Sequence, residues 1–477
     1  MSVFSIIKKI SLNDKFSFIA TKYATYLIYF IISIVVANKL GLFYFGIYGF
    51  YKLLLQYFTY SNLGVNYSGI VLMSEQIERN RNKDNKLVVS SILISIVAFI
   101  IFFLLFFFIS ILWFAEIYDK YLIHQYLAFT FFVVIFKQIN QIFINTNRVY
   151  NKLKIINWAY LIPCFGELLA LFLGKEESLF INICWAMVIS NGLVTFIFIL
   201  ANAFPLRIVW DLSTIKQLIN RGFMLLLYNV SFYFIILIAK GYISGHFNVE
   251  QFAQYSFSYN ISDAVMLLNN SISFLVYPTL INNLCKCKSS EERIGVMYNI
   301  QEKYMLVANL IIIIAYALIP VLHFIVPEYN KAADILAVLL LSQLLVANTF
   351  TLTTNLVQAK AELKLIALGV LSIVVVLFSS WLFSTLSENL VVVSYALVIA
   401  MFGYNLGAAL LTKKSLKIRN KGLINMINPI YFFPIIVAQI SRTFFDHYIS
   451  TILFIIATML LLSKSYIKLI RSYSHAR

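Results

Sequence analysis

Ionisable side chains lie inside long apolar stretches of this sequence, where a charge is costly and usually serves binding or transport. Most of those with candidate roles are lysines, and two are carboxylic acids: Lys22, Lys52, Lys137, Lys240, Glu167 and Asp263. Fixed positive charge in a cavity of low dielectric constant suits an anionic group such as phosphate, whereas an exporter of organic cations would need buried acids. The excess of lysines over carboxylic acids among these intramembrane residues predicts an anionic substrate. The two carboxyls are candidates for coupling transport to H⁺ or Na⁺.

Neutral polar side chains accompany these charges at steps of three or four residues, so they share helix faces. The candidates for lining a substrate cleft with the lysines are Gln56, Tyr60, Asn229, Tyr233, Tyr259 and Asn270. Each group also has a simpler structural interpretation. Lysines near a span end extend to the membrane interface, and tyrosines pack or line that interface. Lys52 and Asp263 lie deeper in their spans, and each could either face the cavity or serve in a structural ion pair or a hydrogen bond between helices, so both interpretations stay open.

The elements that carry these side chains are membrane helices by composition. Hydrophobic residues make up 61% of the 477-residue chain and charged residues 12%, against about half and about a quarter in soluble proteins. A helix that crosses the hydrocarbon core needs about 20 mostly apolar residues. Fourteen stretches qualify: 17–37, 43–72, 87–112, 122–144, 156–174, 179–203, 222–243, 251–281, 294–326, 333–357, 365–385, 388–411, 427–445 and 449–463. The sequence predicts an all-α polytopic membrane protein with about 14 transmembrane helices.

The excess of positive charge follows the connections between these stretches. Lys and Arg together number 37 against 20 Asp and Glu, for a formal net charge of +17. If the N-terminus is cytoplasmic and the connections alternate, most Lys and Arg fall on the cytoplasmic side, as the positive-inside rule requires. The charge therefore indicates topology, with both termini cytoplasmic, and does not indicate nucleic acid as a partner.

A repeated phrase relates the two halves of the chain. The segments FGIYGFY (45–51) and FAQYSFS (252–258) are separated by 207 positions, and the same offset carries the starts of the first six stretches close to those of the seventh to twelfth. Six is even, so the repeats are parallel, and two such lobes facing each other would form a cleft opened to each side in turn. The predicted domains are an N-terminal six-helix lobe (1–204), a cytoplasmic connector (205–221), a C-terminal six-helix lobe (222–412), and a basic loop with two additional helices and a cytoplasmic tail (413–477).

The first predicted hairpin resembles that of bacterial O-antigen flippases and related polysaccharide exporters. Its sequence, ANKLGLFYFGIYGFYKLLLQYFTYSNLGVNYSGI (37–70), has the family's base before LG, then FG-x-Y, then a second LG, at Lys39, Leu40-Gly41, Phe45-Gly46, Tyr48 and Leu63-Gly64. The family often has Arg and Asp before the two LG pairs, where this chain has Lys39 and Asn62. The segments GHFNVEQFAQYSFSYNISD (245–263) and FLVYPTL (274–280) are also similar.

The resemblance implies a transporter of the multidrug/oligosaccharidyl-lipid/polysaccharide exporter superfamily in the bacterial inner membrane. The fold it implies is two parallel six-helix repeats in a V-shaped arrangement plus a C-terminal helix pair, which is found in flippases of lipid-linked substrates. The implied substrate is an oligosaccharide repeat unit on undecaprenyl pyrophosphate, for O-antigen and lipopolysaccharide biosynthesis or a related surface polysaccharide. The pyrophosphate would meet basic residues in the cavity, and Lys52 lies on a span used in that way. Partners implied are the lipid bilayer, the lipid-linked oligosaccharide, and a polysaccharide polymerase and chain-length regulator.

Two other functions compete with this interpretation. An ion-coupled small-molecule or drug antiporter of the same fold usually stops at twelve spans, and a polytopic O-antigen polymerase usually carries a large periplasmic loop. The sequence has neither a D-x-D motif nor a G-x-x-x-x-G-K-[ST] phosphate loop, so we expect no enzyme activity. Cys285 and Cys287 form a C-x-C pair without a nearby His or second pair, a poor zinc pattern. We expect no metal and no cofactor.

Overall fold

A computed structural model describes residues 3–74, 81–201, 206–207, 211–287, 289–329, 331–416, 427–442 and 444–474. Helices account for nearly all of these residues, and the described part contains no strand. The stretches expected to span the membrane fall on helical segments, except that the thirteenth, 427–445, is helical over only part of its described residues. The class predicted from the sequence, an all-α polytopic membrane protein, is confirmed.

The chain divides into two compact units. The N-terminal unit comprises Met1–Val230 with Phe247–Ala253, and the C-terminal unit comprises Ser231–His246 with Gln254–Arg477. The boundaries of the four domains expected from the sequence stay predictions.

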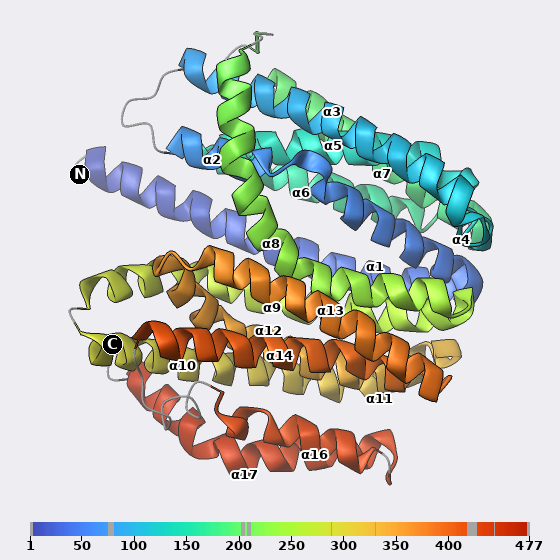
Figure 1. The fold of residues 1–477 in the computed structure, drawn as a ribbon, viewed down its shortest axis with the longest axis vertical. Helices are drawn as coiled ribbons and strands as arrows, with labels where there is room; N and C mark the ends of the chain where they lie inside the picture. Colours follow the sequence, from blue (N-terminus) through green and yellow to red (C-terminus); the bar gives the residue numbers. More distant parts are fainter. Residues whose placement is uncertain are drawn as a thin grey trace. The chain divides into compact units, whose positions relative to one another are not determined.

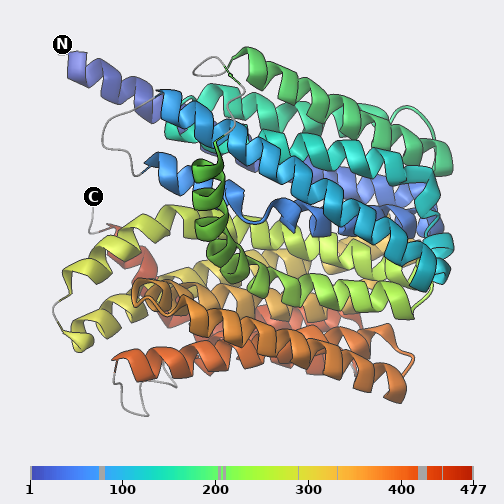
Figure 2. The ribbon, with the colours of Figure 1, turned by 45° about the horizontal axis from the view of Figure 1, so that its top comes forward.

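The N-terminal unit is a bundle of helices that run side by side (Figures 1 and 2). Its helices are α1 (Val3–Thr59), α2 (Val65–Ser74), α3 (Arg81–Trp113), α4 (Ala115–Lys120), α5 (Ile123–Val149), α6 (Leu153–Ala170) and α7 (Glu176–Leu200), with a 3₁₀ turn η1 (Tyr60–Asn62) after α1. The first part of α8 (Leu212–His246) also belongs to this unit. Packing is closest between α6 and α7, α5 and α7, and α1 and α6.

The C-terminal unit holds the rest of α8, α9 from Gln254 onward, and the remaining helices. They are α9 (Val249–Lys286), α10 (Ser290–Ala317), α11 (Ile319–Ile325), α12 (Ala332–Gln358), α13 (Glu362–Leu386), α14 (Leu390–Leu416), α16 (Phe433–Ser441) and α17 (His447–Ser474), with 3₁₀ turns η2 (Pro327–Tyr329) and η3 (Pro429–Tyr431). The core of this unit is α12, which is buried along most of its length and packs against α14 and α10. Arg442 joins the C-terminal helix pair to the core, because its guanidinium lies 2.6 Å from a carboxylate oxygen of Asp334 on α12.

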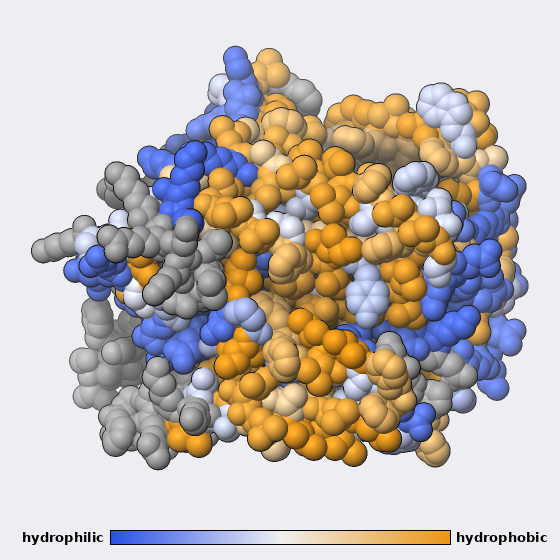
Figure 3. Space-filling view, turned by 60° about the horizontal axis from the view of Figure 1, so that its bottom comes forward, coloured by the Kyte–Doolittle hydropathy of each residue, from blue (hydrophilic) through white to orange (hydrophobic). Residues whose placement is uncertain are grey.

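Ten helices in the described part are long and apolar enough to cross a membrane. The first of them, Ser17–Asn62, covers one expected span and most of the next in a single helical stretch. This continuous stretch explains part of the difference between ten helices and fourteen expected spans. The expected spans outside the ten correspond to α9, to η3 with α16, and to α17. The α9 segment is rich in Ser, Asn and Gln, which lowers its hydropathy. The face in Figure 3 has hydrophobic side chains over the middle of the helices and hydrophilic ones toward their ends, as a bilayer requires.

Gly41 explains how α1 accommodates two spans. The helix has 57 residues, which at 1.5 Å per residue would be about 85 Å long, far more than the hydrocarbon core of about 30 Å. Gly41 interrupts it with φ 67° and ψ 173°, a conformation that side chains disfavour. Beside it, the Lys39 ammonium donates to the carbonyl of Leu171, 2.6 Å away at the end of α6, where a cation is favoured. The base and the glycine of the first LG pair therefore both have structural roles.

Gly64 and Gly222 bring α8 against the start of α2. Gly64 has φ 78°, and a Cβ placed on it would collide with the carbonyl group of Gly222. The neighbouring Ser68 hydroxyl donates to the carbonyl of Leu218, 2.8 Å away. The second LG pair thus marks a close backbone contact within the N-terminal unit.

Candidate functional site

A charged cluster lies inside the N-terminal unit, between α1, α5 and α6. The Lys52 ammonium on α1 lies 3.2 Å from a carboxylate oxygen of Glu167 on α6, and 5.1 Å from the centroid of the Tyr48 ring one turn earlier. The Glu167 side chain is 4% exposed, whereas that of Lys52 is 25% exposed. Lys52 can therefore meet a ligand while Glu167 holds its ammonium from the protein side. We call Lys52, Glu167 and Lys137 the lysine cluster.

Lys137 on α5 completes the lysine cluster. It interacts electrostatically with both Lys52 and Glu167. Its side chain is partly exposed, and it makes no hydrogen bond or ion pair with the residues that the structure describes. With all three groups ionised the cluster has one excess positive charge. A buried or half-buried ammonium without a counter-charge is unfavourable, so an anionic ligand would be stabilised at this position.

Local sequence explains how α6 presents Glu167. Pro163, one turn earlier, removes a backbone hydrogen bond within the helix. Gly166, next to the carboxyl, lets α6 approach α7 closely, because a Cβ there would lie 3.0 Å from the Cβ of Ser190. Gln56, one turn after Lys52, has a side-chain oxygen that is buried without a hydrogen-bond partner in the described part. The lysine cluster thus sits beside further unsatisfied polar surface.

Other predicted site residues of the N-terminal part lie away from this cluster or bond locally. Lys22 places its ammonium 5.7 Å from the ring centroids of Phe18 and Tyr160. Asn229 donates to the carbonyl of Leu225 on its own helix. Tyr60 is partly exposed in η1. The structure thus gives Lys22 and Asn229 contacts that need no substrate.

A second charged group lies in the C-terminal unit. The Lys240 ammonium on α8 lies 4.7 Å from the Tyr259 ring centroid on α9, and Asp263, one turn after Tyr259, interacts electrostatically with Lys240. Lys240 is 1% exposed, so its stem does not extend to the interface and its ammonium is closed to a ligand in this structure. Asp263 is partly exposed, which keeps it available to a small cation. The side chain of Asn270, also a predicted site residue, lies outside the described ones.

A cavity of about 130 Å³ lies within the C-terminal unit, between α8, α9, α10 and α12. Among the described residues of the lining, Tyr233 is the one that was predicted as a site residue, and it is 36% exposed. Sequence reasoning missed the rest of the lining, including Asn269, Tyr304 and Gln343. Asn269 lies six residues after Asp263, off the helix face that led to Asn270 seven residues after it, so the spacing along α9 did not mark it. Nor does any signal mark Gln343, which stands in the apolar run LLLSQLLVA.

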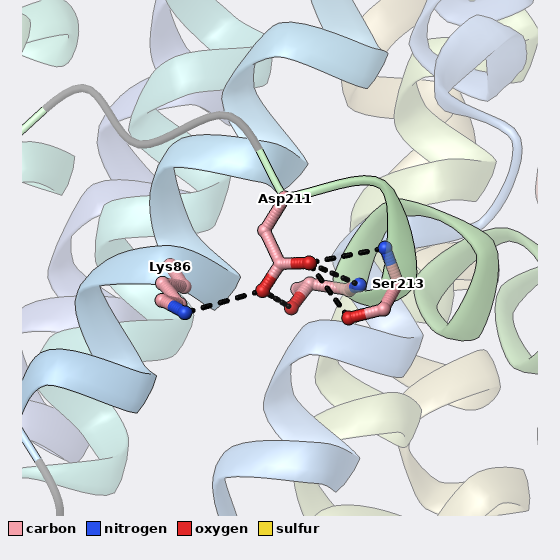
Figure 4. A network of polar contacts seen from close by, with 4 residues as sticks. Lys86, Asp211 and Ser213 are labelled. Atoms are coloured by element: carbon pink, nitrogen blue, oxygen red, sulfur yellow. Dashed lines mark hydrogen bonds and ion pairs between the residues drawn. The ribbon is translucent and has the colours of Figure 1, made fainter.

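Asp211 fixes the start of α8, the helix that passes from one unit to the other (Figure 4). One carboxylate oxygen accepts from the backbone N–H and the hydroxyl of Ser213, at 3.0 and 2.6 Å. The other lies 3.3 Å from the Lys86 ammonium on α3. The hydrogen bonds from Ser213, and then the contact with Lys86, hold the pKa of Asp211 below its usual range. The connector is therefore attached to the N-terminal unit by an ionised helix cap.

In the part of the chain that the structure describes, no group of three or more His, Cys, Asp or Glu side chains could hold a metal ion. No protein-family model matches the sequence. No curated protein matches it either.

Solved structures share the fold. One is described as "Lipid II flippase MurJ, inward closed conformation", with a TM-score of 0.71 at 13% identity, covering 95% of this chain and 100% of that chain. Another is an inward-facing multidrug resistance MATE family transporter of the MOP superfamily, with a TM-score of 0.61 at 11% identity, covering 83% of this chain and 94% of that chain. At such low identity the likeness concerns the fold alone: this chain has the architecture seen in a lipid II flippase and in a MATE transporter.

Proposed function

We propose that this protein is a flippase that moves an undecaprenyl-pyrophosphate-linked oligosaccharide repeat unit from the cytoplasmic to the periplasmic leaflet of a bacterial inner membrane. The observation that carries the proposal is the lysine cluster, with its excess positive charge and the unpaired, partly exposed ammonium of Lys137 among the described residues. The fold likeness to a lipid II flippase supports a lipid-linked substrate. The hairpin resemblance supports a polysaccharide precursor as that substrate.

In this proposal the substrate diphosphate binds the ammonium groups of Lys52 and Lys137. Glu167 holds Lys52 in place when the site is empty, so that the lysine is neither buried alone nor lost to the interface. The sugars follow the polar side chains, and the polyprenyl tail stays in the lipid. The lobes expected at 1–204 and 222–412 move against each other in alternating access, with both termini in the cytoplasm.

The carboxyls supply a candidate coupling step. Asp263 is partly exposed and interacts electrostatically with the buried Lys240. Uptake of H⁺ or Na⁺ by Asp263 or Glu167 would change the charge of its group and bias the lobes toward one state. Asp263→Asn and Glu167→Gln, singly and together, test this hypothesis. It is wrong if both changes leave transport and its dependence on H⁺ and Na⁺ unaltered.

The leaflet location of lipid-linked intermediates tests the flippase itself. Deleting the gene should make single repeat units accumulate on the cytoplasmic side and should abolish surface polymer. Restoring the wild-type chain should reverse both effects, and Lys137→Ala should not. Single units that reach the outside but stay unpolymerised would instead indicate a polymerase.

A drug or small-molecule antiporter is the second candidate, favoured by the fold likeness to a MATE transporter. It predicts unchanged lipid-linked sugars in the deletion strain and increased sensitivity to cationic compounds. The same strain therefore separates the two functions.

A further inference from the structure

The cavity in the C-terminal unit differs from the lysine cluster because none of the described residues that line it carries a charge. That lining combines rings with amides and hydroxyls: Phe232, Tyr233 and Tyr304, then Asn269, Ser273 and Gln343, with two threonines on α12. Asp263 interacts electrostatically with Tyr233, and Lys240 offsets its charge. A charged ligand would lose its hydration in this cavity without gaining a counter-charge.

Several hydroxyl groups of the cavity can accept a hydrogen bond from a ligand but already donate their own protons elsewhere. The hydroxyl of Thr353 donates to the carbonyl of Thr349, 2.9 Å away, and the hydroxyl of Thr349 donates to that of Val346, 2.7 Å away. Tyr304 donates to the backbone carbonyl of Asn269 at 3.1 Å. Since these protons are already committed to the backbone, the hydroxyl oxygens have lone pairs left for an incoming donor. A ligand rich in hydroxyl groups supplies such donors.

The size and the rings of the cavity fit one six-membered ring. The volume of about 130 Å³ is close to that of an engineered cavity of about 150 Å³ that takes up benzene. The rings of Tyr304 and Phe350, both in the lining, have centroids 4.9 Å apart and are tilted by 39°. They offer an apolar surface beside the polar one, which matches a pyranose with its C–H face on one side and its hydroxyls around the edge.

We propose that this cavity is a subsite for one neutral sugar residue, a hexose or an N-acetylhexosamine. The inference rests on the proposed function for the origin of that sugar, as part of the lipid-linked oligosaccharide. The subsite takes a neutral residue and rejects uronic acids and sugars with a free amine, because nothing in its lining offsets their charge. In this proposal the lysine cluster binds the diphosphate, and the cavity separately recognises the glycan.

Adjacent threonines on α12 provide a matched test. Thr353 lines the cavity, whereas Thr354 is absent from the lining, yet both donate to carbonyls three or four residues earlier in the helix. Saturation-transfer NMR on the full chain in lipid nanodiscs should detect methyl glucoside or methyl N-acetylglucosaminide, and detect neither glucuronate nor glucosamine. Thr353→Val keeps the shape of the side chain and removes its hydroxyl, so it should weaken that binding by up to about tenfold, the effect of one lost hydrogen bond, and Thr354→Val should leave it unchanged.

A second variant keeps the test independent of the hydroxyl. Phe350→Ala removes one of the two paired rings, Tyr304 and Phe350, and should abolish the sugar signal in protein that still elutes as a single species. Absence of binding by any neutral sugar, or equal binding of charged and neutral sugars, would overturn the proposal and leave the cavity to water. Loss of binding in Thr354→Val to the same extent as in Thr353→Val would also overturn it.

The sugar-binding measurement uses neither polyprenyl lipid nor transport, so it tests the subsite independently of the proposed flippase function. Sugar binding in a protein whose deletion leaves lipid-linked intermediates in place would retain the subsite and remove the flippase. A leaflet defect without sugar binding would retain the flippase and remove the subsite.

Discussion

Removing both members of the Lys52–Glu167 pair distinguishes a substrate-binding lysine from a structural one. Two unit charges 3.2 Å apart attract by about 5 kcal/mol at an effective dielectric constant of about 20. Lys52 is a quarter exposed, so solvent screening reduces the expected coupling to about 2–3 kcal/mol. Glu167→Leu alone leaves an unpaired ammonium and should destabilise the protein by about that amount. Lys52→Met alone should do the same, because it leaves a nearly buried carboxylate.

The double variant Lys52→Met/Glu167→Leu should recover most of the stability, because replacing both partners by apolar groups is often neutral or stabilising. It should still fail to flip the lipid-linked oligosaccharide, because the ammonium that binds the diphosphate is gone. Thermal unfolding of purified protein measures the first outcome, and the leaflet distribution of intermediates in complemented cells measures the second. The analogous change at the more exposed Lys86–Asp211 pair serves as control, with a coupling of about 0–1 kcal/mol.

Recovery of both stability and transport in the double variant would refute the substrate role of Lys52. The pair would then be a structural contact between α1 and α6, and the positive charge needed for a diphosphate would have to come from elsewhere. Loss of stability in the double variant equal to the sum of the single changes would refute the pairing itself, because coupled partners are not additive.

Three further changes have expected outcomes. Lys137→Ala should abolish flipping with little loss of stability, since this lysine makes no hydrogen bond or ion pair with the described residues, and Lys137→Arg should retain partial complementation of surface polymer. Gly222→Ala should lower stability by about 1–3 kcal/mol, because the new Cβ would lie 2.8 Å from the carbonyl of Gly64; Gly295→Ala, with open space around it, should be neutral or slightly stabilising in the same thermal assay. Asp211 has a lowered pKa, so its contribution to stability is fully present above its unfolded pKa of about 3.9 and is lost progressively as the pH falls from that value through the lower folded pKa. The gap in unfolding temperature between wild type and Asp211→Asn should therefore be constant near neutral pH and narrow steadily below about pH 4. A gap that stays the same between about pH 6 and pH 2 would contradict the ionised cap.

The sequence predicted the helices well because hydrophobic runs and the positive-inside rule depend only on local composition. It could identify Lys52 and Glu167 as unusual, but it could not pair them, since the two residues are 115 positions apart and helix rotation sets their distance. It left Lys240 between a cleft role and an interface role, whereas the structure encloses its ammonium over Tyr259. The neutral cavity escaped prediction for a similar reason, because four helices contribute to it and each supplies only one to six side chains.

The single-residue break at Gly41 has a consequence for how the protein inserts into the membrane during its synthesis. Two spans joined without a polar loop leave almost nothing hydrophilic to carry through the bilayer during synthesis, apart from Lys39, whose charge would cost about 3 kcal/mol at the membrane centre. We therefore expect the first two spans to leave the translocon together as a helical hairpin, without waiting for later segments. A truncated nascent chain ending after the second span should already resist carbonate extraction, and one ending before Gly41 should resist it less.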